Sequence, residues 1–489
     1  MTKKEYFQDE NFIIKGYWWL PECCQQVAGE FDYNEEKMSL SLYGGLSRAT
    51  VVAPFNASPD TPKHNIIHGN SLDGCPITLF NAFYTKWNSN ITSLDLKPKT
   101  QVDLRASRLS CSILIKGIHL SSENEPFSKC QIKIPFLEHW IGKSPFKVQV
   151  DNSLSEINID YSRPENEEFE INDHDCYVRL VHLASSPAIP YGTSPQVRHI
   201  SHLEIEPYEP QSMEWFIKYT SELVDFLGVT YGGSILSKQI NLYKKISEEN
   251  QIVPIYFCRK KAKVEQYERN SFMVRYEDIK SMFQEILTGW LNATHKEKLA
   301  RNMLISNERR PPDFLELRFL PLAHAAEVLS YETDYSTIVE KHEFKNIKKE
   351  MLDSVSEKIP SELKQSINNC LQWANGRNLK GKLKSVLNDL EEKTRSLFCV
   401  DSDLFIDGIV NTRNHYTHYS TKPGKKILQG VELHWGIQKL SLMVRILLLL
   451  RSGVDEKIIQ TKFGSDNRLA VERVVWMEIC EEGSEYRVN

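Results

Sequence analysis

The spacing of hydrophobic residues changes along the chain. From about residue 12 to 205, short runs such as 38–43 and 111–116 alternate apolar and polar positions, and turn residues separate these runs. From about residue 276 onward, apolar residues recur every three or four positions, which predicts amphipathic helices. The pattern therefore predicts an α+β protein, in which a β-rich N-terminal domain is followed by an α-helical bundle.

The helical signals also predict a domain boundary. A first helix is expected over 211–227, with Gly228 as its C-cap. Further helices are expected over 279–291, 313–331, 335–354, 360–373, 380–396, 401–418 and 431–452. We place the boundary near residue 270, so that 1–269 form the β-rich domain and 270–489 form the helical domain. A subdivision of the first domain near residue 205, where helical signals begin, stays open.

Length and composition agree with two domains in an ordinary globular protein. The chain has 489 residues, of which 41% are hydrophobic and 26% are charged. A single hydrophobic core rarely supports a chain of this length. The formal net charge of -5 argues against a surface coated in basic residues for non-specific nucleic-acid binding. One local basic patch would still suffice for an enzyme that acts on RNA.

The sequence predicts a cytoplasmic protein without a membrane segment. The N-terminus lacks the apolar stretch of a signal peptide. The most apolar run, 440–450, is interrupted by Ser441 and Arg445 and is shorter than the roughly 20 residues that span a bilayer. The ten cysteines include no C-x2-C pair typical of a zinc site, so we expect them to pack as small apolar side chains. We expect no metal and no other cofactor.

The stretch 405–419 changes from apolar to polar. Its first half reads as an amphipathic helix, on which the apolar side chains are expected to face inward: Leu404, Phe405, Ile409 and Val410. Its second half is a dense group of Arg, Asn, His and Tyr side chains, and a proline and a glycine at 423–424 end the helix. Polar side chains at the end of a well-packed helix are held in place yet open to solvent, which is typical of a functional site.

Three side chains of this stretch can act on a phosphodiester. Asn414 and His418 are four residues apart and share a helix face, and the long side chain of Arg413 can reach the same side. Arginine binds phosphate through two parallel hydrogen bonds, and histidine titrates near neutral pH and can transfer protons. Asparagine can hold a phosphate oxygen or orient the imidazole. RNA supplies its own nucleophile, the 2′-hydroxyl, so such a site needs no metal.

Neighbouring residues are candidates for binding RNA. His415 is expected to face either solvent or the cleft. Tyr416 and Tyr419 could stack on unpaired bases, although packing against neighbouring helices is the more common role of such tyrosines. The three lysines that follow could steer RNA phosphates or form a solvated loop, and the sequence favours neither alternative. These lysines are Lys422, Lys425 and Lys426.

The motif and its surroundings resemble the Apea-like branch of the HEPN superfamily. Arg413-Asn414-x3-His418 is similar to the R-x4–6-H signature of that superfamily, in which a polar residue, often Asn, follows the Arg. The wider helical context that resembles this branch lies in 315–327, 379–387 and 409–414. The N-terminal half resembles the domain that precedes this module in ApeA-type anti-phage defence proteins, through 16–21, 29–31 and 68–79. The resemblance covers essentially the whole chain.

The resemblance implies a fold and an activity. It implies a HEPN bundle that forms a homodimer or higher homo-oligomer and brings two motifs into one cleft. It also implies a ribonuclease that cleaves cellular RNA, with tRNA favoured, and halts phage propagation by abortive infection once a phage-derived trigger is sensed. In this scheme Arg413 binds the scissile phosphate, Asn414 supports it, and His418 is the general acid or base. The products carry 2′,3′-cyclic phosphate and 5′-hydroxyl ends, and the N-terminal domain senses or regulates.

Two other interpretations stay open. In one, the HEPN fold only dimerises and captures a partner, but degenerate domains of that kind usually lack the Arg or the His, and both are present. In the other, the cleft binds a regulatory nucleotide rather than cleaving RNA.

A near match to a phosphate-binding P-loop at 376–382 is followed by Leu383 instead of Ser or Thr, so we expect a turn between helices there.

Overall fold

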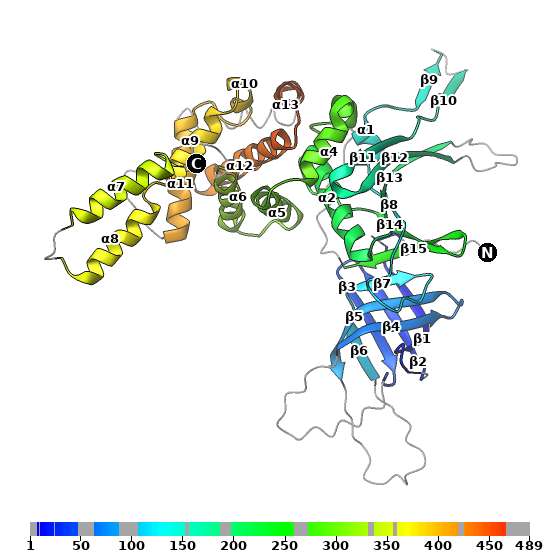
Figure 1. The fold of residues 1–489 in the computed structure, drawn as a ribbon. Coiled ribbons are helices and arrows are strands. Elements are labelled where there is room, and N and C mark those ends of the chain that lie inside the picture. Colours follow the sequence, from blue (N-terminus) through cyan, green and yellow to red (C-terminus); the bar gives the residue numbers. More distant parts are fainter. Residues whose placement is uncertain are drawn as a thin grey trace, which may run out of the picture. The chain divides into compact units, whose positions relative to one another are not determined.

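A computed structural model gives the fold, which divides into two compact units. The first unit comprises Met1–Leu227 and Ile235–Glu268, and the second comprises Gly228–Ser234 and Arg269–Asn489. Figure 1 shows the strands in the first unit and most of the helices in the second, which confirms the predicted order of a β-rich half and a helical half. The structure describes residues 7–8, 10–23, 25–46, 63–87, 106–151, 156–185, 197–258, 272–330, 337–355, 359–418 and 425–465.

Six antiparallel strands at the start of the chain form a closed barrel. They are β1 (Phe12–Trp19), β2 (Val27–Asn34), β3 (Lys37–Tyr43), β4 (Lys63–Ser71), β5 (Pro76–Trp87) and β6 (Ala106–Ser110). The strand order β5-β4-β1-β2-β3-β6 closes on itself because β5 also pairs with β6. Alternate side chains, among them Phe31 and Leu40, are fully buried and fill the interior. The period-two pattern of the sequence is the direct consequence of this alternation.

One close contact explains a glycine in the barrel wall. Trp18 on β1 is fully buried and lies opposite Gly69 on β4. A Cβ atom at position 69 would lie 2.3 Å from the Trp18 ring, so only glycine leaves room for the indole. The segments 16–21 and 68–79, which resemble ApeA-type proteins, therefore meet in paired strands.

An open antiparallel sheet continues from the barrel. Beyond β5 its order is β7-β15-β14-β8-β13-β12-β11, and β9 pairs with β10 in a separate hairpin. A long helix, α2 (Met213–Tyr231), packs on the open sheet, where Thr220 Oγ1 lies 3.8 Å from Cys130 Sγ of β8. The remaining elements of this half are β7 (Ile113–Lys116), β8 (Lys129–Lys133), α1 (Leu137–Ile141), β9 (Phe146–Val150), β10 (Ile157–Tyr161), β11 (Glu167–Ile171), η1 (Asn172–His174), β12 (Cys176–Ser185), β13 (Arg198–Pro207), β14 (Gln239–Ile246) and β15 (Glu249–Phe257).

Helix α2 continues past the residue predicted to end it. Gly228 lies inside the helix, which runs to Tyr231 and is followed by Gly232 with a φ of 87°. The prediction that Gly228 is the C-cap is therefore wrong. The extra turn buries Val229 completely, and the carbonyls of Gly228 and Val229 accept hydrogen bonds from Arg445. These partners are more than 200 residues away in sequence, so no local pattern could show them.

The second unit is a helical bundle around α6. Helix α6 packs against α5, α9, α11 and α12, which are other helices of this unit. Its helices are α3 (Tyr276–Ile279), η2 (Lys280–Met282), α4 (Phe283–Leu291), α5 (His295–Arg309), α6 (Leu315–Leu329), α7 (Lys341–Asp353), α8 (Ser361–Trp373), α9 (Leu379–Asn388), α10 (Glu392–Arg395), α11 (Ser402–His418), α12 (Gly430–Arg451) and α13 (Glu456–Gly464). Helix α12 is long and apolar enough to cross a membrane, but 72% of its most apolar stretch is buried in the bundle, as in a core helix.

Several details of the helical unit differ from the sequence prediction, among them α13, which was not predicted, and the segment 279–291, which is divided between α3, η2 and α4. Helix α5 was not predicted, because most of its residues are polar and only a narrow stripe including Ala300, Leu304 and Ile305 is buried. A capping box formed by Thr294 and Glu297 was the available signal for it. The helix expected over 380–396 is two helices, α9 and α10, with a turn between them.

Candidate active site

Helix α11 carries the polar motif and is held by a buried face. The side-chain carboxylate of Asp401 accepts the backbone N–H of Leu404 at 2.9 Å and so caps the first turn. Ile406 and Ile409 are fully buried, and Phe405 packs against Phe398 with ring centroids 6.0 Å apart. The expectation that Leu404 faces inward is wrong, because this side chain is 56% exposed. The first buried side chain of the helix is Ile406, two residues after the position that the sequence pattern suggested.

Helix α11 is also joined to α9 by ion pairs on the surface. Lys380 Nζ lies 2.5 Å from Asp407 Oδ1, and Lys384 Nζ lies 2.8 Å from Asp403 Oδ1. All four side chains are largely exposed, so each pair contributes little to stability. Their main consequence is that these two lysines of α9 are neutralised by carboxylates.

The segment before α12 is anchored to α11 by one buried side chain, Leu428. Leu428 packs against Gly408 of α11 and Gly436 of α12, where added Cβ atoms would lie 3.5 and 2.8 Å from it. Its backbone N–H donates to the hydroxyl of Thr412, which is fully buried, at 2.9 Å. Thr412 therefore attaches the segment that carries Lys425 to the helix that carries Arg413.

Replacing Thr412 by valine should destabilise this attachment. Valine keeps the shape of threonine but leaves the buried N–H of Leu428 without an acceptor, which costs about 1–3 kcal/mol. We expect a thermal midpoint several degrees lower, measured by circular dichroism. Thr412→Ser, which keeps the hydroxyl, is the control. Equal midpoints for the valine and serine variants would contradict the role given to this hydrogen bond.

Arg413 lies at the surface end of α11 with two partners. Its Nη1 donates to Asn414 Oδ1 at 3.2 Å, and its Nη2 lies 3.4 Å from Glu327 Oε2 on α6. The Arg413 side chain is 31% exposed, whereas that of Glu327 is 17% exposed. The guanidinium is thus oriented from two sides and still reaches solvent.

Glu327 also binds a second cation from a third helix. Its Oε1 lies 3.5 Å from Nζ of Lys382 on α9, a side chain that is only 8% exposed. One carboxylate is therefore shared by two cations, and the three side chains together carry one net positive charge. Glu327 and Lys382 were not singled out as site residues from the sequence, although both lie in segments noted for their resemblance to the Apea-like branch.

The remaining residues of the motif occupy the end of α11. His418 is its last residue and is exposed, and its side chain forms no hydrogen bond or ion pair within the described parts of the chain. Asn414, His415 and Tyr416 are half-buried. The rings of His415 and Tyr416 meet edge to face at 5.2 Å, and burial, followed by the carboxylate of Glu316, raises the pKa of Tyr416.

The candidate RNA-binding lysines are only partly described. Lys425 is exposed, and Lys426 Nζ lies 3.0 Å from Glu432 Oε1 in an exposed pair. Tyr419 and Lys422 lie outside the described residues. The structure thus joins Arg413 and Asn414 directly and places His418 at the end of the same helix, while the roles of all these residues stay predictions.

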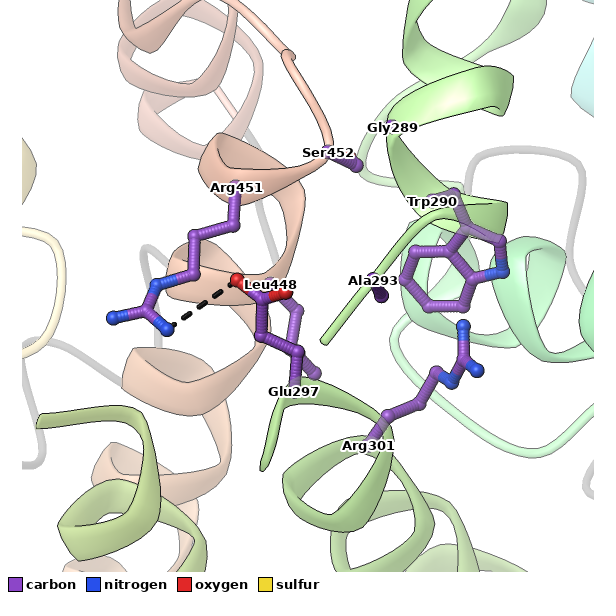
Figure 2. A pocket seen from close by; sticks show the side chains of 8 residues that line it. All are labelled: Gly289, Trp290, Ala293, Glu297, Arg301, Leu448, Arg451 and Ser452. Carbon is purple, nitrogen blue, oxygen red and sulfur yellow. Dashed lines mark hydrogen bonds and ion pairs between the residues drawn. The ribbon is translucent and has the colours of Figure 1, made fainter. Parts of the chain in front are cut away.

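A small pocket in the helical unit is lined by residues outside the polar motif of α11. Figure 2 shows that Trp290, Arg301, Glu297 and Arg451 line it. Arg301 stacks on the Trp290 ring at 4.3 Å, and Arg451 Nη1 lies 3.4 Å from Glu297 Oε1. None of its lining residues belongs to α11, and these contacts serve packing between α4, α5 and α12. In the part of the chain that the structure describes, no group of three His, Cys, Asp or Glu side chains could hold a metal ion.

Two family models match the chain. The one described as ApeA N-terminal domain 1 matches residues 13–290, and the one described as Apea-like HEPN matches residues 320–458. The second match includes Glu327, Lys382, Arg413 and His418. No curated protein and no solved structure matches the chain.

Proposed function

Because the chain belongs to the family of ApeA-type HEPN defence proteins, we propose that it is a metal-independent RNA endonuclease of anti-phage defence. HEPN domains are generally ribonucleases, and they typically dimerise and bind RNA. The observation that carries the proposal is the cluster at the end of α11. Helix α11 carries a solvent-reachable arginine and an exposed histidine, and Arg413 together with Glu327 of α6 and Lys382 of α9 has a net positive charge.

Each residue of the cluster has a role in the proposed reaction. Arg413 binds the scissile phosphate, since a guanidinium stays charged and pairs with two phosphate oxygens. Asn414 orients that guanidinium through its Oδ1, and Glu327 holds it from the other side. His418 accepts the proton of the RNA 2′-hydroxyl as general base.

The bond changes of the reaction follow from this arrangement. The 2′-oxygen forms a bond to phosphorus, and the bond from phosphorus to the 5′-oxygen breaks. The leaving 5′-oxygen takes a proton from a general acid, for which the His418 of a second copy in a HEPN dimer is suited. The products are a 2′,3′-cyclic phosphate and a 5′-hydroxyl, and the positive cluster stabilises the charge on the pentacoordinate phosphorus.

The proposal also covers substrate, assembly and location. We expect the substrate to be cellular RNA with unpaired loops, tRNA first, because unpaired bases can be splayed out and recognised. We expect a homodimer through the HEPN domain in the cytoplasm. The N-terminal domain would release the activity when it meets a phage component, and abortive infection would follow.

Cleavage of total tRNA in EDTA tests the proposal. We expect the wild-type protein, in phage-infected lysate where the trigger is present, to cut tRNA and leave 2′,3′-cyclic phosphates. We expect His418→Ala to lose about 10²–10⁴-fold in rate. His295→Ala, which removes an exposed histidine from the start of α5, is the matched control and should cut normally. Cleavage that needs a divalent metal, or that survives His418→Ala, would contradict the mechanism. An absence of cleavage in infected lysate would favour a HEPN domain that only dimerises and binds.

A further inference from the structure

Helices α7 and α8 form an arm that leaves the bundle. In Figure 1 both helices extend away from the rest of the helical unit, and none of their described side chains is buried. The base of the arm is clamped by Asn375, whose Oδ1 accepts the N–H groups of Ile338 and Val339 at 3.2 and 2.9 Å. Asn375 Nδ2 donates in return to the Val339 carbonyl at 2.9 Å.

The arm leads directly into a helix of the candidate active site. Three residues after Asn375, Asn378 caps α9 by accepting the N–H of Gly381 at 2.9 Å. The next residue, Lys382, is the one that binds Glu327 beside Arg413. The base of the arm therefore lies only a few residues from the lysine that shares Glu327 with Arg413.

One face of α7 is a stripe of lysines. At 100° per residue, these lysines fall within a sector of roughly 100° that runs for about 12 Å along the axis. The three acidic residues of the helix, Glu343, Glu350 and Asp353, lie outside this sector. The lysine stripe consists of Lys341, Lys345, Lys348 and Lys349.

Within the described residues, the lysine stripe has no carboxylate partner, whereas several other exposed lysines of the same unit do. Lys380, Lys384, Lys426 and Lys462 each form an ion pair with a carboxylate. No carboxylate of the described residues pairs with any lysine of the stripe; three of the four are exposed, and Lys348 is half-buried. In a chain with a net charge of -5, four free ammonium groups on one helix face form a distinct local positive field.

We propose that the lysine stripe of α7 binds the phosphate backbone of the RNA that Arg413 cleaves, an inference that rests on the proposed ribonuclease function. Ammonium groups repeated along a helix match the repeated phosphates of a single strand, and lysine binds phosphate as a point charge. Of the apolar side chains on the face next to the stripe, Phe344 and Ile347 are half-buried, and Met351 alone is largely exposed, at 49%. This favours a polyanion over a lipid surface, for which exposed apolar side chains would be needed.

The test uses the full-length chain with His418→Ala, so that RNA is bound but not cut. Binding of a labelled single-stranded RNA is measured by fluorescence anisotropy over a range of salt concentrations. The stripe variant carries Lys341→Gln, Lys345→Gln, Lys348→Gln and Lys349→Gln. The control variant loses the same charge from exposed lysines of the first unit: Lys37→Gln, Lys63→Gln, Lys143→Gln and Lys245→Gln.

We expect the stripe variant to bind RNA at least tenfold more weakly and to lose roughly 2–3 units from the slope of log affinity against log salt, at about 0.7 per phosphate contact. The control variant should keep the parental affinity and slope. An unchanged stripe variant, beside a parent that binds RNA, would overturn the role of α7 alone. A parent that binds no RNA, even after an extract of phage-infected cells is added, would overturn both the stripe and the proposed function. Stripe-dependent binding to phosphatidylserine vesicles, with RNA affinity unchanged, would assign α7 to a membrane surface instead.

Discussion

Arg413→Ala should lower the rate of RNA cleavage by on the order of 10²–10³-fold, because it removes the charged donor that the proposed site aims at the developing phosphorane. The overall fold should remain. Arg413 is 31% exposed, and its contacts with Glu327 and Asn414 are not part of the buried core. Cleavage is measured under the conditions in which the wild-type protein is active, and circular dichroism checks the fold.

Two further variants make this result specific. Arg413→Lys keeps the charge but loses the planar pair of donors, so we expect only partial recovery of the rate. Arg310→Ala removes an exposed arginine at the end of α5, outside the motif, and should cleave at the wild-type rate. If Arg413→Ala and Arg310→Ala cleaved equally well, the guanidinium of Arg413 would have no catalytic role.

The sequence was informative where periodicity or local chemistry set the structure. Strand alternation around Phe31 and Leu40 reflects the closed barrel, and the polar end of the helix that carries Arg413 follows from its pattern. The ion pairs around Glu327 could not be predicted from the sequence, because they join α6 to α9 and α11 across 55 and 86 residues. The orientation of Arg413 depends on these contacts between helices, so a motif could name the residue without its partners.

The lysines also show that a sequence pattern can reveal a group of charged residues without revealing their ion-pair partners. A run of basic residues such as 422–426 is visible in the sequence, yet Lys426 is paired with Glu432. The stripe of α7 is interrupted by Phe344 and Ile347, and it emerges only when the helix and its missing carboxylate partners are known. Whether a lysine is free to bind phosphate is a property of packing, which composition does not show.

Arg445→Met should destabilise the helical unit by about 3–5 kcal/mol, the usual cost of removing one partner of a buried ion pair. Arg445 is only 2% exposed, and its Nη1 donates to the carbonyls of Gly228 and Val229 at 3.0 and 2.7 Å. Its Nη2 pairs with Glu308 of α5. Methionine fills a similar volume but leaves these carbonyls and the Glu308 carboxylate without their donor. Urea unfolding followed by circular dichroism measures the loss.

The loss of unfolding free energy caused by Arg445→Met should become larger as the pH rises. Burial raises the pKa of Glu308, and the guanidinium of Arg445 opposes this increase. Without Arg445 the pKa of Glu308 rises further, so protonation relieves the burial of the carboxyl as the pH falls, and the loss of stability should be smaller at about pH 5 than at about pH 8, where folding must bury a carboxylate or keep it protonated. A raised folded pKa of an acid gives stability that is present at low pH and lost as pH rises through that pKa. Adding Glu308→Gln should therefore restore part of the stability and remove the extra dependence on pH. A single variant whose deficit is the same at both pH values would show that Glu308 does not carry the uncompensated charge.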